Sequence, residues 1–178
     1  MKLPASPLRG MLNEIVELPG AAAGAAQPPI SVVTRLSFPA PPDVVWEGLM
    51  LYEQIGMRPP LLLRLLLPVP IRIEGRKSEV GDEVKCHYRS GHLLKRVTQV
   101  TRGRNYEFDV IAQNLTLPGG IRLSGGSYTL RQLADGRTEV ALMTRYVSPL
   151  RPRWFCRRIE AVVCHSFHRY ILGAMYNT

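Results

Sequence analysis

The chain of 178 residues carries 23 Lys and Arg against 14 Asp and Glu, a formal charge of +9, and 46% of its residues are hydrophobic. That length and composition fit one folded domain, and they exclude an intrinsically disordered or fibrous protein. The positive charge favours anionic partners, such as a nucleic-acid backbone, an acidic lipid surface or a carboxylate ligand, and does not decide among them.

The three cysteines, Cys86, Cys156 and Cys164, exclude two cysteine-based architectures. They are odd in number and lack CxxC spacing, which argues against both a disulfide framework and a structural zinc site. No secretory pattern is recognised at the N-terminus, because Glu14 and Glu17 interrupt any apolar leader segment. We therefore expect a cytoplasmic protein with no metal site and no other cofactor.

The first 29 residues differ in composition from the rest of the chain. Residues 1–29 alternate Pro, Gly and Ala with few large apolar side chains, so we expect a flexible N-terminal arm, with room for one helical turn around Met11 to Val16. A single domain is predicted over residues 30–178. It begins with ISVVTRLSF, whose alternation predicts a half-buried strand.

The next segment changes to helical spacing. Pro42 suits a helix start, Asp43 lies in the first turn where negative charge is favourable, and apolar residues then repeat at helical spacing as far as Tyr52. The apolar segment of residues 59–73 is broken by one Arg and two Pro and is too short to span a bilayer. Periodicity leaves two interpretations of it, a second helix or an extended lid.

Six strand-like segments follow residue 71, separated by turns such as Gly81-Asp82 and Asp135-Gly136. Short hairpins between neighbours imply an antiparallel meander, and Gly125-Gly126 inside one segment predicts a bulge or sharp bend. After Ser148 the spacing is helical again, which predicts a long final helix. Its broad apolar stripe comprises Phe155, Ile159, Val162, Val163, Ser166, Phe167, Tyr170 and Ile171.

The order of these elements resembles the helix-grip fold of the SRPBCC superfamily, which holds START lipid carriers and polyketide cyclases/dehydrases. The strings PAPPDVVWEGL, with its Val45-Trp46 pair, VGDEVKCHY, GGSYTLRQLADGRTEV and TRYVSPL resemble segments of that superfamily. The resemblance runs from about Ile30 to the C-terminus. It implies an α+β helix-grip fold: a curved antiparallel sheet of about seven strands wrapped around a long C-terminal helix, with one or two short helices after the first strand. It implies no catalytic motif, because the superfamily has none in common.

Strand alternation selects the side chains that we expect to face the interior. One face of each of three strands is apolar with occasional hydroxyl groups, which suits a ligand that is mostly hydrocarbon with a polar end. Together with two residues of the final helix, the predicted ligand-binding set is Cys86, Tyr88, Tyr106, Phe108, Leu142, Thr144, Tyr146, Cys164 and His168.

The final helix carries an acid, a thiol and an imidazole on one stripe. Glu160, Cys164 and His168 are spaced at i, i+4 and i+8, with His165 beside them. A functional interpretation makes His168 the catalytic general base, or a donor to a ligand carbonyl, assisted by a tyrosine of the sheet. A structural interpretation pairs Glu160 with an Arg, packs Cys164 as a small hydrophobic residue and bonds His168 to a backbone carbonyl. The sequence leaves both open.

Four arginines, Arg151, Arg153, Arg157 and Arg158, gather at the start of this helix, where positive charge opposes the helix dipole. Nearby acids, an anionic membrane surface or a ligand carboxylate would each compensate them. Nucleic acid is not expected as a partner, because the basic residues are not interleaved with exposed aromatic residues.

Two functional hypotheses follow. The first is binding or transport of a hydrophobic small molecule, such as a lipid, isoprenoid or aromatic polyketide, in a cavity between the sheet and the C-terminal helix, with residues 59–73 as its gate. The alternative is a polyketide cyclase/dehydratase-type enzyme that uses His168 and a cavity tyrosine for proton transfer. The sequence identifies neither the ligand nor the presence of catalysis.

Overall fold

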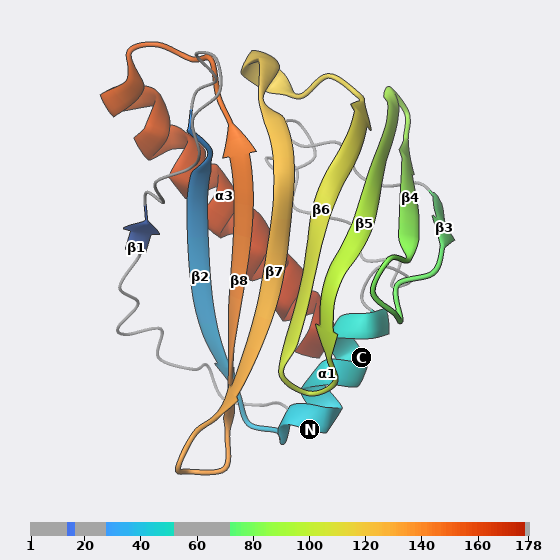
Figure 1. The fold of residues 1–178 in the computed structure, drawn as a ribbon. Coiled ribbons are helices and arrows are strands. Elements are labelled where there is room, and N and C mark those ends of the chain that lie inside the picture. Colours follow the sequence, from blue (N-terminus) through green and yellow to red (C-terminus); the bar gives the residue numbers. More distant parts are fainter. Residues whose placement is uncertain (1–13, 17–27, 52–71, 177–178) are drawn as a thin grey trace.

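One antiparallel sheet and one long helix dominate the computed structural model, which describes residues 14–16, 28–51 and 72–176. The helix runs diagonally across the concave face of the sheet (Figure 1). The strand order is β1-β2-β8-β7-β6-β5-β4-β3. The strands are β1 (Glu14–Val16), β2 (Ile30–Phe38), β3 (Arg72–Gly75), β4 (Glu83–Tyr88), β5 (Gly91–Thr101), β6 (Asn105–Asn114), β7 (Arg122–Gln132) and β8 (Thr138–Val147), and the helices are α1 (Pro42–Leu51), the 3-10 turn η2 (Pro118–Gly120) and α3 (Arg153–Tyr176). This is the predicted helix-grip fold: β2 to β8 are the seven expected strands, and the six predicted hairpin segments are β3 to β8.

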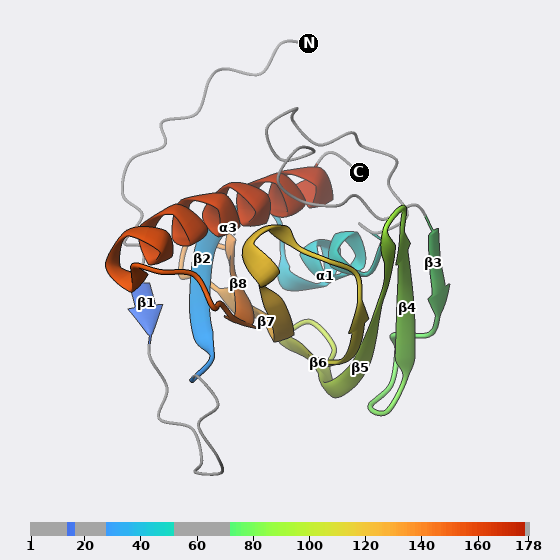
Figure 2. The ribbon, with the colours of Figure 1, turned by 90° about the horizontal axis from the view of Figure 1, so that it is seen from above.

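Helix α1 closes one end of the concave face. It starts at Pro42 with Asp43 in its first turn, as the sequence predicts, because proline is favoured in the first turn and a carboxylate there complements the helix dipole. Its inner side chains Val45, Trp46 and Leu49 are buried. Viewed from above, α1 lies beneath the C-terminal half of α3, and it contacts both α3 and β7 (Figure 2).

The sheet bends where two consecutive glycines lie in β7. The register between β7 and β8 shifts between Leu123 and Gly125, as the predicted bulge requires. A Cβ at Gly125 would lie 2.6 Å from the Phe108 carbonyl oxygen, and one at Gly126 would lie 2.8 Å from that of Met143. The neighbouring backbones therefore approach too closely for side chains at these two positions.

The buried apolar side chains form two clusters. The larger one joins α1 and the C-terminal half of α3 to the middle of the sheet, and it includes Trp46, Val140 and Leu172. The smaller one lies at the far end of the concave face, and it includes Cys86 of β4, Leu93 of β5 and residues of the β6–β7 connection. The concave face therefore carries a packed cluster at either end.

Two parts of the sequence prediction need comment. Glu14–Val16 pairs with β2 as a strand, with Ile15 opposite Val32, so the helical turn expected around these residues is wrong. The unpaired backbone groups at the edge of β2 gain hydrogen-bond partners from this short strand. The composition of residues 11–16 alone does not reveal such a distant pairing. Residues 1–13, 17–27 and 59–71 lie outside the described residues, so the flexible arm, the domain boundaries and the gate stay predictions. No helix in the described ranges combines the length and apolar content needed to cross a bilayer.

Candidate functional site

The seam between α3 and the sheet holds two groups of buried polar side chains. The first surrounds Glu160, which is only 8% exposed. The Tyr146 hydroxyl donates to Glu160 Oε2 at 3.1 Å and the Ser148 hydroxyl donates to Oε1 at 2.5 Å. Burial, and then the nearby Glu160 carboxylate, raise the pKa of Tyr146. The structural interpretation expected Glu160 to pair with an arginine. Its carboxylate instead accepts hydrogen bonds from Tyr146 of β8 and from Ser148, the residue after that strand.

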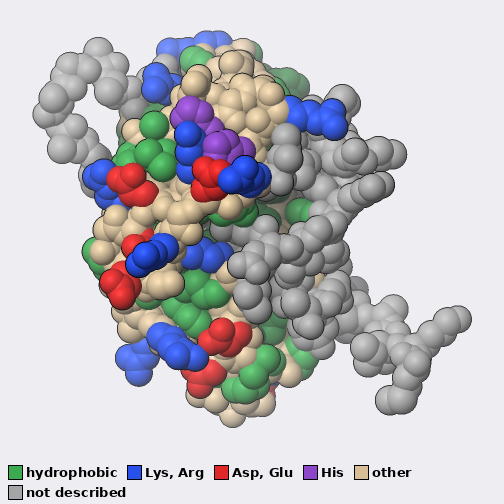
Figure 3. Space-filling view, turned by 90° about the vertical axis from the view of Figure 1, so that its right-hand side faces the viewer, with side chains coloured by type: hydrophobic (Ala, Val, Ile, Leu, Met, Phe, Trp, Pro, Cys, Tyr) green, Lys and Arg blue, Asp and Glu red, His purple; other side chains and the backbone are tan. Residues whose placement is uncertain are grey.

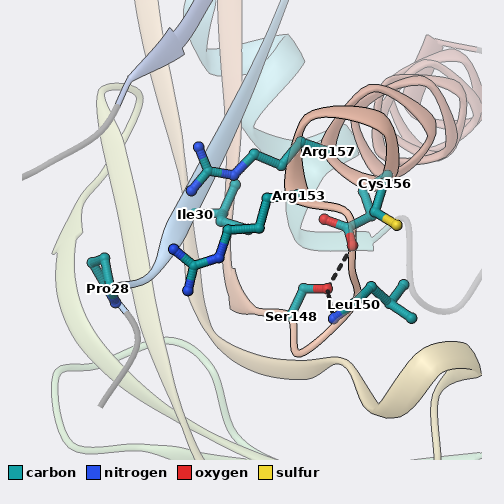
Figure 4. A pocket seen from close by; sticks show the side chains of 8 residues that line it. Pro28, Ile30, Ser148, Leu150, Arg153, Cys156 and Arg157 are labelled. Atoms are coloured by element: carbon teal, nitrogen blue, oxygen red, sulfur yellow. Dashed lines mark hydrogen bonds between the residues drawn. The ribbon is translucent and has the colours of Figure 1, made fainter. Parts of the chain in front are cut away.

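A small pocket lies beside this carboxylate, near the start of α3. Its lining includes Arg153, Cys156 and Arg157, and the two arginine side chains extend toward Pro28 and Ile30 at the start of β2 (Figure 4). The enclosed space is about that of one water molecule. Two of the four arginines that the sequence grouped together are therefore turned into this pocket and away from the exposed side of the helix.

The second polar group surrounds His168, which is fully buried. Its Nδ1 lies 2.8 Å from the Thr34 hydroxyl of β2, and its Nε2 lies 2.7 Å from the Thr144 hydroxyl of β8. Cys164 Sγ is a third neighbour, 3.4 Å from Nε2. The same Thr34 hydroxyl is 2.7 Å from Nδ1 of His165. Threonines, and neither a tyrosine nor a backbone carbonyl, are thus the partners of His168.

The single hydroxyl proton of Thr34 couples the two imidazoles. Thr34 can donate to only one Nδ1 atom, so it must accept a hydrogen bond from the other, and one of the two rings carries its proton on Nδ1. Nε2 of His165 is buried and finds no partner among the described residues. Leaving an acceptor lone pair unpaired at this atom costs less free energy than leaving an N–H unpaired, so the proton of His165 is favoured on Nδ1. His165 then donates to Thr34, Thr34 donates to Nδ1 of His168, and Nε2 of His168 donates to Thr144.

Burial keeps both imidazoles neutral. Desolvation, with a smaller contribution from His165, lowers the pKa of His168 to about 3. Desolvation and then the Arg169 charge also lower the pKa of His165. Burial raises the pKa of the Cys164 thiol to about 12. An uncharged relay of this kind stabilises the contact between helix and sheet, and its members are weak bases and weak nucleophiles at neutral pH.

A second pocket lies on the concave face, away from the seam. It is lined by Leu49 and Met50 of α1, by Lys77 and Val84, and by Lys95, Tyr106, Phe108 and Tyr128 of the central strands. Its enclosed space is again about that of one water molecule. The Lys95 ammonium lies 4.8 Å from the centroid of the Phe108 ring, and the rings of Tyr106 and Tyr128 lie 6.3 Å apart.

The predicted ligand residues fall into three places. Tyr106 and Phe108 line the concave-face pocket. Cys86 and Tyr88 belong to the smaller apolar cluster at the far end of the sheet. The others lie along the inner side of β8 and the facing side of α3, namely Leu142, Thr144, Tyr146, Cys164 and His168. The fold therefore does not gather the predicted set around one cavity.

Sequence reasoning missed Lys95, the inward-facing cation. Leu93 and Val97, two residues away on either side, are buried, so alternation places Lys95 on the same inner face of β5. A charged residue within an otherwise apolar alternating face was the signal that could have found it. Tyr128 of β7 was also missed. Its spacing of two residues from Leu130 was the signal in the sequence, and both side chains are buried in the structure.

The comparisons with known proteins concern the fold. No family model matches the sequence, and no curated protein is similar to it. The Zhui aromatase/cyclase from Streptomyces sp. R1128 matches with a TM-score of 0.55 at 18% identity, covering 84% of this chain and 92% of that one. Ara h 8.0201 matches with a TM-score of 0.52 at 14% identity, covering 84% of this chain and 96% of that one. Protein MLL2253 from Mesorhizobium loti matches with a TM-score of 0.52 at 17% identity, covering 83% of this chain and 98% of that one. At these identities the three structures show the fold alone, and this chain has the same helix-grip fold.

Proposed function

We propose that the protein binds a small apolar molecule that carries an anionic end, on the concave face between α1 and strands β4 to β7. The observation that carries this proposal is Lys95, a cation on the inner face of the sheet between the buried Leu93 and Val97. A long amphipathic side chain in that position covers apolar surface with its methylenes and presents an ammonium group to the pocket. Lipids with a free carboxylate and acidic aromatic molecules have the matching chemistry.

The residues that line the pocket match the chemistry of such a ligand, although the ligand would have to displace side chains, because the enclosed space is about that of one water molecule. Tyr106 and Tyr128 bring two phenol groups to an otherwise apolar wall, and Lys77 adds a second cation. None of the described residues that line the pocket is acidic. A carboxylate or phosphate would compete with the contacts that Lys77, Lys95, Tyr106 and Tyr128 already make within the protein. The hydrocarbon part would contact Leu49, Phe108 and their neighbours.

The experiment compares a fluorescent polyene fatty acid with its methyl ester. Replacing Lys95 with Met keeps the length and removes the charge, so we expect about tenfold weaker binding of the acid and little change for the ester. Lys85→Met is the matched control, because Lys85 lies on the opposite face of the neighbouring strand β4. Equal loss for acid and ester would refute the anionic end, and binding of neither probe would refute the binding function.

Native mass spectrometry of the protein purified from its own host, followed by organic extraction, would identify the natural ligand. A stoichiometric apolar acid is the expected passenger. A neutral passenger would contradict the role proposed for Lys95 and leave the binding function standing. Location in the cytoplasm, which the three free cysteines support, is part of the same proposal.

The cyclase/dehydratase alternative has weaker support. Its base would be His168, whose two ring nitrogens already bond Thr34 and Thr144 and whose pKa is about 3. Serving as a base would require breaking one of these bonds as well as overcoming the low basicity. Turnover of a poly-carbonyl substrate that is lost in His168→Gln, with the fold retained, would restore this alternative.

A further inference from the structure

The outward side of the first half of α3 carries large apolar side chains. Trp154 is 69% exposed, Phe155 49%, Ile159 50% and Val162 65%. Phe155, Ile159 and Val162 are spaced at i, i+4 and i+7, so they form one stripe with Trp154 beside it. The sequence grouped three of them with the inner residues of one broad stripe, whereas the structure turns them away from the sheet.

Exposed arginines accompany this stripe. Arg151, Arg158 and Arg169 are exposed, and within the described part of the chain none of the three pairs with an acid. The only acidic residue of α3 is Glu160, which is buried against two hydroxyl groups. The exposed side of the helix is thus apolar and cationic, with no negative charge of its own.

The β3–β5 side of the molecule shows the ordinary arrangement by contrast. Basic and acidic side chains alternate there (Figure 3). Arg72 pairs with Glu74 and Arg96 pairs with Glu83, so the charges within each pair cancel. Solvated surface arginines usually find such partners or lie among polar neighbours. An uncompensated set beside four exposed apolar side chains indicates an external partner that is both apolar and negatively charged.

We propose that this face of α3, made by Trp154, Phe155, Ile159 and Val162 with Arg151, Arg158 and Arg169, docks on the surface of an anionic lipid bilayer. An amphipathic helix of this composition lies in the interface plane, where aromatic rings reach the acyl boundary and guanidinium groups meet lipid phosphates. The helix is convex and the apolar side chains protrude from it, which suits a flat, deformable surface better than a preformed protein groove. The proposal does not depend on the ligand pocket, whose lining includes no residue of α3.

Arg153 and Arg157 are not part of this face. They line the small pocket beside Glu160. Of the four arginines that the sequence analysis considered for a membrane surface, the proposed face therefore keeps Arg151 and Arg158, and it adds the exposed Arg169 further along α3. Membrane contact by Arg153 and Arg157 stays a prediction of the sequence alone.

The experiment is co-sedimentation of the full-length protein with vesicles of phosphatidylcholine alone or mixed with phosphatidylserine. We expect binding to the mixed vesicles, weakened by salt, and little binding to phosphatidylcholine alone. Replacing Arg151, Arg158 and Arg169 together with Gln should weaken binding on the order of 100-fold, at about fivefold per arginine. Trp154 fluorescence should be quenched by brominated lipid, whereas the buried Trp46 should not respond.

Matched substitutions separate this face from general stickiness. Val162→Asn should weaken vesicle binding, whereas Val80→Asn, at a valine that is equally exposed at 64% in another part of the molecule, should not. All these positions are exposed, so the variants should fold, which circular dichroism checks. Absence of binding to the mixed vesicles overturns the proposal, as does a dimer that Val162→Asn dissociates while vesicle binding is absent. Equal effects of the two valine substitutions also overturn it.

Discussion

Acidification should destabilise the protein through its buried imidazoles. The unfolded chain binds a proton at each histidine below its ordinary pKa of 6.5, whereas His168 in the native state stays neutral down to about pH 3. The unfolded state therefore holds more protons between these two values, and the free energy of unfolding must fall as the pH falls. One such histidine contributes a slope that approaches about 1.4 kcal/mol per pH unit, or about 2 kcal/mol between pH 8 and pH 5. His165 acts in the same direction.

Urea unfolding at fixed pH values from 8 to 5, followed by circular dichroism, measures this slope. His168→Gln removes the titrating group and keeps a hydrogen-bonding side chain, so the slope should decrease by about one proton even if the variant is less stable at every pH. Glu74 and Asp135 have lowered pKa values, so these two carboxyl groups titrate below this window. Identical slopes for the variant and the unchanged protein between pH 7 and pH 5 would refute the neutral, buried relay.

Two further predictions concern packing and backbone. Leu172→Ala should lower the free energy of unfolding by about 2–5 kcal/mol in a urea titration, because this fully buried leucine of α3 packs in the larger apolar cluster; a loss under 1 kcal/mol would show that α3 is loosely held. Gly91→Ala should abolish the native near-ultraviolet circular dichroism or lower Tm by many degrees, because φ is +148° and the new Cβ would lie 1.6 Å from the Asn114 carbonyl oxygen; a stable variant would mean that β5 and the end of β6 can separate at this turn.

The agreement between sequence and structure is best where the signal is local. Alternation in β4, β6 and β8 assigns Val84, Tyr106 and Val140 to the interior, and all three are buried. The helix start at Pro42 and the bend at Gly125 follow from the conformational limits of single residues, and they too are found as expected. Such features depend on neighbours within a few positions, so one sequence is enough to predict them.

The sequence by itself determined the order of strands and helices, the bent sheet and the inner face of most strands, because side-chain periodicity and turn chemistry act over short distances. Only the tertiary structure decided which groups meet: Thr34 bonds His165 and His168 across 131 and 134 residues of chain, and the Glu160 carboxylate meets two hydroxyl groups in place of an arginine. It also decided that the stripe around Val162 is exposed. Periodicity reveals that a helix has an apolar face, whereas the packing of the sheet on one side of α3 determines which part of that face is covered.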